Sequence, residues 1–260
     1  MRLGMIGVGA MGQAIARRLL EKPPWDDLQL YLCDLDISKA DRYHDYPNVY
    51  FNTDISALTG CDLIILAVKP QGAIPVLQEL AKLAVPAIIS IVAGITLEEL
   101  VKFSNTAAIR VMPNTPSLIG EGISVLTYSA DVSAYQKEQA KTIFMTLGEV
   151  VELEEKFFSV VTALSGAGPA YVYLMIEALI DAACAHGLSR DVAKQLVVST
   201  FIGSAKLVEQ SQLHPAILKD QVTSPGGVTI SALHVMEQRG LRGILWDAVS
   251  QGVAKANDLK

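Results

Sequence analysis

The chain has 260 residues, of which 51% are hydrophobic, and a formal net charge of −6 at pH 7. This length predicts one large or two ordinary domains with a sizeable core, and an acidic balance without a basic block argues against nucleic-acid or anionic-membrane partners. The three cysteines, Cys33, Cys61 and Cys184, are far apart and form no C-x-x-C pair, so they indicate buried thiols in a reducing, cytoplasmic compartment and neither a disulfide framework nor a metal site.

The first predicted element is a short apolar strand that ends at Ile6 and breaks into a glycine-rich turn. Gly7, Gly9 and Gly12 follow the G-x-G-x-x-G pattern, and a helical apolar period continues to Leu20. In a dinucleotide-binding turn these glycines permit the turn, the approach of a pyrophosphate and the packing of helix on strand. The anion lies at the helix N-terminus, where free N–H groups favour negative charge. Glycines also cluster in purely structural turns, but the strand before and the helix after favour a cofactor site.

Strands and helices alternate through the first half of the chain. The further predicted strands are 28–33, 49–51, 62–68, 87–92, 109–112, 123–128 and 150–153, and the predicted helices include 72–83, one that opens at the capping box 96–99, and 132–147. The apolar run 62–68 is typical of a parallel strand covered on both faces. This alternation predicts an α/β domain over residues 1–154 with a Rossmann-type, doubly wound parallel sheet.

After Glu154 no strand pattern remains, and the sequence predicts an all-α second domain over residues 155–260. The helices expected at 169–186 and 192–208 are apolar around most of their circumference. A small helical domain cannot bury both by itself, so we expect a second copy of the chain to cover them in a homodimer or a higher homo-oligomer. No uncharged run reaches the length of a membrane span, and no membrane partner is expected.

In an open parallel sheet, ligands bind beyond the carboxyl ends of the strands. The segments expected there are 7–12, Asp34, Asn52, 67–70, Ala93 with Gly94, and 113–116.

Asp34 follows Gly12 by 22 residues. A carboxylate at that place accepts hydrogen bonds from a ribose 2′-hydroxyl and repels a 2′-phosphate. The sequence therefore predicts that NADH is used at least as well as NADPH. Two alternatives stay open: Asp36 is close enough to face the ribose instead, and Lys39 or Arg42 could offset the charge of a phosphate.

A second glycine turn, Ser224-Pro225-Gly226-Gly227-Val228-Thr229, leads into a predicted helix of the second domain. It is another candidate anion site, because free N–H groups at a helix N-terminus favour negative charge, and Thr229 would place a hydroxyl beside the ligand. An ordinary capped turn is the alternative. The four histidines, His44, His186, His214 and His234, share no motif and are expected to be caps or surface residues. A cofactor site without an obvious general acid fits a substrate that already carries its proton.

Four motifs together resemble pyrroline-5-carboxylate reductase. They are Ala67-Val68-Lys69-Pro70-Gln71, Arg110-Val111-Met112-Pro113-Asn114-Thr115-Pro116, Leu164-Ser165-Gly166-Ala167-Gly168-Pro169-Ala170-Tyr171 and the turn 224–229, in order over nearly the whole chain. The resemblance implies a Rossmann domain and a helical domain that interlocks with a second subunit. It also implies reduction of 1-pyrroline-5-carboxylate to L-proline with NADPH or NADH, the last step of proline biosynthesis.

The resemblance assigns most of the candidate site residues. The cofactor-binding residues are Ile6, Gly7, Val8, Gly9, Ala10, Met11, Asn52, Ala67, Val68, Lys69 and Pro70, to which the strand-end argument adds Asp34 and Ala93. The substrate-binding residues are Ser224, Gly226, Gly227 and Thr229. The amides around Gly226 and Gly227 would hold the substrate carboxylate. Thr229, in the catalytic role, would hydrogen-bond the nitrogen of the iminium that accepts hydride.

The chain departs from the family pattern at three places. Ala167 stands where serine is common, Gln212 stands where an acidic residue is common, and 33–36 is Cys-Asp-Leu-Asp where NADP-preferring members carry small or basic residues. Two other functions are alternatives to the reductase. A β-hydroxyacid dehydrogenase uses a catalytic lysine on a long helix, and 169–186 contains no lysine. A non-catalytic dinucleotide-binding sensor would not need the turn 224–229.

Overall fold

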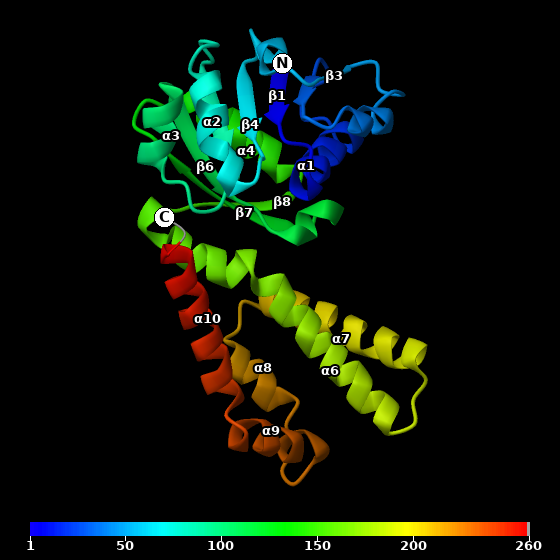
Figure 1. The fold of residues 1–260 in the computed structure, drawn as a ribbon. Coiled ribbons are helices and arrows are strands. Elements are labelled where there is room, and N and C mark those ends of the chain that lie inside the picture. The colour runs from blue at the N-terminus through cyan, green and yellow to red at the C-terminus, as the bar shows by residue number, and fades with distance from the viewer. Residues whose placement is uncertain (259–260) are drawn as a thin grey trace. The chain divides into compact units, whose positions relative to one another are not determined.

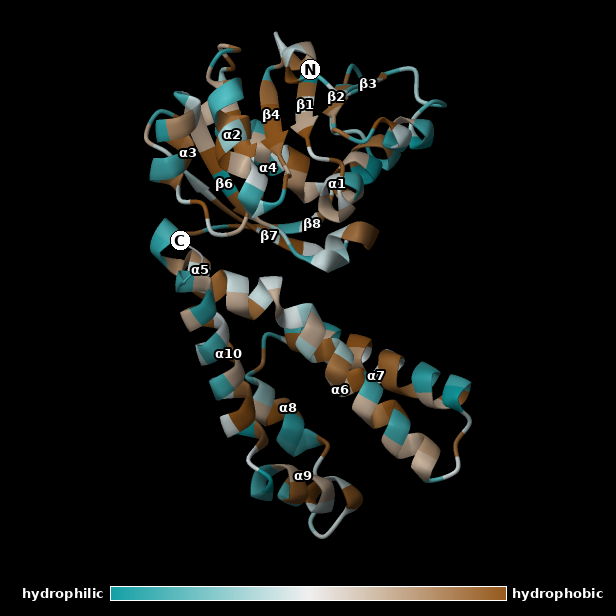
Figure 2. Cartoon of the chain, in the orientation of Figure 1, coloured by the Kyte–Doolittle hydropathy of each residue, from teal (hydrophilic) through white to brown (hydrophobic). Residues whose placement is uncertain are grey.

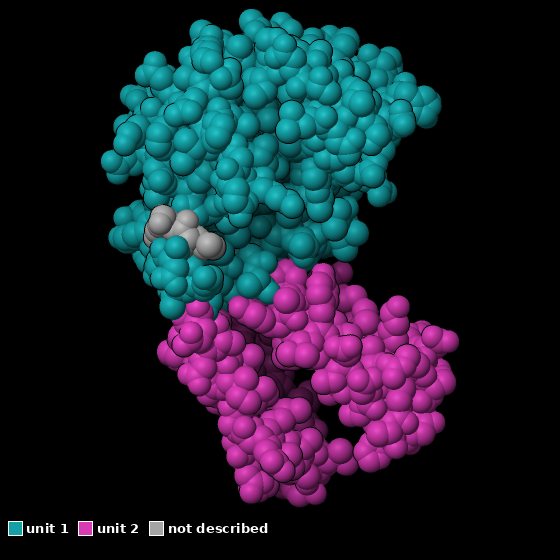
Figure 3. All heavy atoms as spheres, viewed as in Figure 1, with its two compact units in different colours: residues 1–167, 252–260 teal, residues 168–251 magenta. Residues whose placement is uncertain are grey.

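The structure is a computed structural model that describes residues 1–258. Its contacts divide the chain into two compact units, residues 1–167 with 252–260 and residues 168–251, which Figure 3 shows in different colours. Residues 259–260, which the predicted second domain included, lie outside the described residues.

The first unit is built on one eight-stranded sheet with strand order β3-β2-β1-β4-β5-β6-β7-β8 (Figure 1). The strands are β1 (Arg2–Ile6), β2 (Gln29–Cys33), β3 (Val49–Asn52), β4 (Leu63–Leu66), β5 (Ala87–Ser90), β6 (Ala107–Met112), β7 (Gly122–Tyr128) and β8 (Gly148–Glu152). Neighbouring strands are parallel except β6 and β7, which are antiparallel. The predicted doubly wound parallel sheet is confirmed with this one exception. The linker 113–121 is too short for the dozen or more residues that a parallel crossover needs.

Helices cover both faces of the sheet, as a buried parallel sheet requires. One face packs with α1 (Ala10–Glu21) and α4 (Ala134–Met145), and the other packs with α2 (Pro70–Leu80) and α3 (Leu97–Ser104). Alternate side chains of one strand enter different cores, since Ile65 joins the first cluster and Ile64 the second. All of β4 is buried, as its apolar run predicts.

The first unit also contains the segment that precedes the long helices. The short helix α5 (Phe158–Val161) lies in it, and Phe158 and Val161 pack with Val125 of β7 in a small cluster. The contact division therefore falls at residue 167, whereas the sequence places the domain boundary after Glu154. That boundary stays a prediction.

The second unit is all helical, as predicted, and leaves many apolar side chains exposed. Its helices are α6 (Gly168–Ala185), α7 (Arg190–Ser211), α8 (Pro215–Gln221), α9 (Val228–Gln238) and the start of α10 (Leu241–Asn257). Leu174 on α6 is 65% exposed and Leu196 on α7 is 54% exposed, and Figure 2 shows hydrophobic stretches on both helices, interrupted on α7 by hydrophilic ones. Among the described residues, the continuous helical stretch Glu155–Ala185 is long and apolar enough to cross a membrane by composition, with 17% of its most apolar window buried.

Candidate active site

The glycine turn has the geometry that a bound anion needs. Gly7 has φ +92°, and a Cβ there would lie 2.7 Å from the carbonyl oxygen of Ala67. A Cβ at Gly12 would lie 2.2 Å from the carbonyl oxygen of Gly7, so both positions exclude larger residues. A Cβ at Gly9 would meet nothing within 4 Å. Because Gly9 is also the N-cap of α1 and contributes no side chain, the open space adjoins the first free N–H groups of the helix.

Asp34 lies against this turn. Its Oδ2 accepts hydrogen bonds from the Val8 amide and from Lys39 Nζ, both at 2.7 Å. Its Oδ1 accepts a hydrogen bond from the Asp36 amide at 3.0 Å. Partial burial raises the pKa of the Asp34 carboxyl, but the hydrogen bonds from Lys39, Asp36 and Val8 outweigh it and hold the pKa below its ordinary value. Asp34 is therefore an ionised carboxylate, held by three hydrogen bonds, directly after β2.

Asp36 has a different task. Its carboxylate accepts a hydrogen bond from the Ser38 amide at 3.1 Å and caps the 3-10 helix η1 (Ile37–Arg42). Of the two acids that the sequence left as alternatives, Asp34 is the one that contacts the glycine turn.

The remaining cofactor candidates lie at the same edge of the sheet. In the parallel pairings Ile6 is opposite Leu66 and Cys33 is opposite Asn52, so these strands end together. The Ala67 amide donates to the Ile6 carbonyl at 2.8 Å. Val68 is half-buried, while Lys69, the N-cap of α2, and Pro70, its first residue, are exposed. Exposed Asn52 uses its Oδ1 to accept the Asp54 amide at 2.9 Å, and half-buried Ala93 follows β5.

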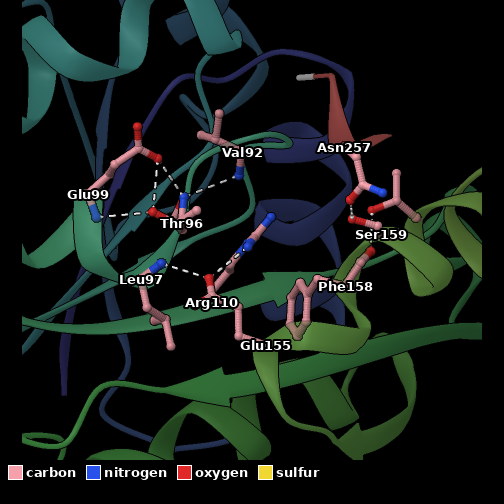
Figure 4. A network of polar contacts seen from close by, with 11 residues as sticks. Val92, Thr96, Leu97, Glu99, Arg110, Glu155, Phe158, Ser159 and Asn257 are labelled. Carbon is pink, nitrogen blue, oxygen red and sulfur yellow. Dashed lines mark hydrogen bonds and ion pairs between the residues drawn. The ribbon is translucent and has the colours of Figure 1, made fainter. Parts of the chain in front are cut away.

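A polar network next to β5 and β6 was not predicted from the sequence (Figure 4). Glu155 Oε1 accepts hydrogen bonds from Arg110 Nη1 and from the Leu97 amide, both at 2.7 Å. The Arg110 guanidinium lies 4.7 Å from the centre of the Phe158 ring. At the start of α3, Thr96 forms the capping box that the sequence predicted. The network joins the loop that carries Ala93 to the segment after β8. Arg110 was visible as part of a motif, but nothing in the sequence identified Glu155 as its partner.

The second glycine turn lies in the helical unit. Gly226 has φ +69°, and the Gly227 amide donates to the Ser224 carbonyl at 3.1 Å. A Cβ at Gly227 would lie 2.3 Å from Ser224 Oγ. Helix α9 begins at Val228 with Gly227 as N-cap and without a side-chain cap, so its first N–H groups are available to an anion. Thr229 is half-buried in the first turn, and its hydroxyl makes no hydrogen bond within the part of the chain that the structure describes.

His214 and two of the cysteines have local structural environments. His214 Nδ1 accepts the Ala216 amide at 3.2 Å and caps α8, as expected for an isolated histidine. Burial raises the pKa of the Cys33 and Cys61 thiols to about 11, which keeps them protonated. Within residues 1–258, no group of three or more His, Cys, Asp or Glu side chains is placed to hold a metal ion.

Comparison with known proteins agrees with this geometry. Residues 155–259 match the family described as pyrroline-5-carboxylate reductase dimerisation, and residues 2–94 match the family described as NADP oxidoreductase, coenzyme F420-dependent. Pyrroline-5-carboxylate reductase of Synechocystis is 38% identical over 99% of this chain and 98% of the relative. The chain belongs to the pyrroline-5-carboxylate reductase family.

Solved structures of the family share the whole fold. The pyrroline carboxylate reductase of Plasmodium falciparum, solved with NADP bound, is 33% identical, covers 100% of this chain and 98% of its own, and has a TM-score of 0.89. The enzyme of Coxiella burnetii is 30% identical, covers 99% and 98% of the two chains, and has a TM-score of 0.91.

Proposed function

We propose that this protein reduces 1-pyrroline-5-carboxylate to L-proline by hydride transfer from NADH or NADPH, the last step of proline biosynthesis. It acts in the cytoplasm as a homodimer or a larger homo-oligomer. The observation that carries the proposal is the second glycine turn. It combines helix N–H groups without a side-chain cap and the unpartnered Thr229 hydroxyl, in a chain whose relatives are named for this reaction.

The substrate side needs a grip on a carboxylate and a contact to the ring nitrogen. The open N-terminus of α9 after Gly226 and Gly227 suits a carboxylate, because its amides carry partial positive charge. Ser224 packs beneath Gly227 and supports the turn. Gly227 already occupies the N-cap position, so Thr229 is not needed as a cap and its hydroxyl is free to hydrogen-bond the iminium nitrogen.

The cofactor side fits a dinucleotide. Open space at Gly9 and the free N–H groups of α1 suit a pyrophosphate, and Asp34 suits a ribose hydroxyl. When bound, NAD(P)H supplies the hydride. Ile6 to Met11, Asn52, Ala67 to Pro70 and Ala93 border this edge and would orient the cofactor. Because Asp34 is ionised, we expect kcat/KM with NADH to be at least as high as with NADPH.

The decisive experiment measures oxidation of NADH and NADPH with the cyclic imine, for the wild type and for Thr229→Val. A hydrogen bond to a charged group contributes about 1.5–3 kcal/mol, so loss of the hydroxyl should lower kcat/KM by about ten- to a hundredfold. Dinucleotide affinity should change little. Thr200→Val is the matched control, because among the described residues the Thr200 hydroxyl bonds only the Leu196 carbonyl of its own helix. Full activity in a folded Thr229→Val protein would remove Thr229 from the mechanism, and a wild type that oxidises neither cofactor would refute the proposed reaction.

A further inference from the structure

Lys39 forms an ion pair with Asp34, the acid proposed to bind the ribose of the cofactor. Its Nζ lies 2.7 Å from Asp34 Oδ2, and only 23% of the Lys39 side chain and 12% of the Asp34 side chain are exposed. Such limited exposure keeps the pair less screened by solvent than an ion pair on the surface. Lys39 therefore offsets part of the negative charge that would repel a 2′-phosphate.

The same carboxylate oxygen also holds the glycine turn. Val8 donates its amide to Asp34 Oδ2 at 2.7 Å, so Lys39 lies one carboxylate away from the segment expected to contact the pyrophosphate. A lysine ammonium has three donors, and among the described residues Lys39 Nζ makes a single hydrogen bond, to Asp34 Oδ2. Its other donors remain able to meet a phosphate oxygen without release of Asp34.

We propose that Lys39 determines how far the protein discriminates between dinucleotides with and without a 2′-phosphate. It offsets the Asp34 charge and supplies a donor to the phosphate, so both cofactors are admitted. This inference rests on the proposed dinucleotide site and deepens it, since it names the residue that sets the margin between NADH and NADPH. Asp34 favours the free ribose hydroxyl, and Lys39 limits that preference.

The test compares two adenosine ligands that differ by one phosphate. Calorimetry gives the dissociation constants of adenosine 2′,5′-bisphosphate and adenosine 5′-monophosphate for each variant. Lys39→Met should weaken bisphosphate binding by about tenfold relative to the monophosphate, the lower end for a hydrogen bond to a charged group. Lys39→Arg should keep the wild-type ratio. Asp34→Asn should shift the ratio toward the bisphosphate, because Lys39 loses its internal partner.

Arg42→Met is the matched control, because Arg42 is an exposed cation on the same 3-10 helix. Thermal melts without nucleotide establish that each variant is folded. An unchanged ratio in folded Lys39→Met, or a larger loss in Arg42→Met, would overturn the role of Lys39 and leave the reductase proposal standing. If neither ligand nor NADH binds the wild type, the dinucleotide site itself is refuted.

Discussion

Removal of the Glu155 carboxylate should destabilise the protein more than removal of its partner, Arg110. The two side chains form an ion pair at 2.7 Å in which Arg110 is 6% exposed and Glu155 is 31% exposed. A leucine at position 155 would leave the guanidinium buried without a counter-ion and would also remove the acceptor of the Leu97 amide. A methionine at position 110 would leave a carboxylate that water reaches and that still accepts the Leu97 amide.

These differences give an asymmetric expectation. Removing one partner of a buried ion pair costs about 3–5 kcal/mol, because the other charge is left uncompensated. Partial hydration places Glu155→Leu near the lower limit, at about 3 kcal/mol. Arg110→Met should cost about 1 kcal/mol, the value of an ordinary hydrogen bond, because methionine retains most of the packing on Phe158. Lys141→Met breaks the more exposed pair with Glu152 and should cost less than either change in the pair of Arg110 and Glu155.

Urea unfolding would measure these free energies. In a Trp246→Phe background the remaining tryptophan, Trp25, packs against the core of the first unit and reports its unfolding. All variants are compared at one protein concentration, because association with a second subunit shifts apparent stability. A loss for Arg110→Met equal to or greater than that for Glu155→Leu would refute the argument from unequal burial.

Three further outcomes are expected. Gly9→Ala should change the unfolding free energy by no more than about 1 kcal/mol, the usual range for an N-cap residue, yet weaken NADH binding by at least about tenfold. Gly12→Ala should lower the unfolding free energy by about 3 kcal/mol through overpacking. Equal effects of the two variants on stability would contradict the steric roles given to Gly9 and Gly12. The folded pKa of Asp34 lies below its ordinary value, so the contribution of its carboxylate to stability is complete above about pH 4 and is lost as the pH falls through the folded pKa. The difference in unfolding free energy between wild type and Asp34→Asn should therefore shrink in acid. A difference that grows in acid would contradict the lowered pKa. Light scattering at micromolar concentration should give a dimer or larger species. A stable monomer would contradict the expectation that a second copy of the chain buries α6 and α7.

The fold was predictable wherever local pattern and packing agree. The apolar run 62–68 contains β4, and the capping box at Thr96 opens α3, because both are set by neighbours in sequence. The direction of β7 was not predictable from alternation of strands and helices, because it depends on the length of the linker 113–121. Likewise Phe158 and Val161 pack on Val125, a contact across sequence that no periodicity indicates.

The motifs of the candidate site were predictable from the sequence, but the contacts between individual side chains were not. The glycine spacing placed Gly7, Gly9 and Gly12 in the turn. Their separate steric roles follow from what a Cβ atom would meet at each position in the structure. Glu155 lies 45 residues from Arg110, so their approach depends on tertiary packing, whereas Lys39 lies 5 residues from Asp34 and reaches it within one local segment. The sequence offers two cations, Lys39 and Arg42, that could offset a phosphate, and in the structure Lys39 is the one whose ammonium contacts Asp34.

Asp34 combines two tasks that a sequence motif does not separate. A motif assigns the carboxylate to the ribose, yet in the structure the same group accepts the Val8 amide and so holds the glycine turn. A serine at position 34 would remove the charge and shorten the side chain, so a change in cofactor ratio would mix lost repulsion with a displaced turn. Asparagine keeps an oxygen acceptor for Val8 while removing the charge. If Asp34→Asn and Asp34→Ser shift the cofactor ratio equally but only the serine variant weakens binding of both dinucleotides, the two tasks of Asp34 are separated.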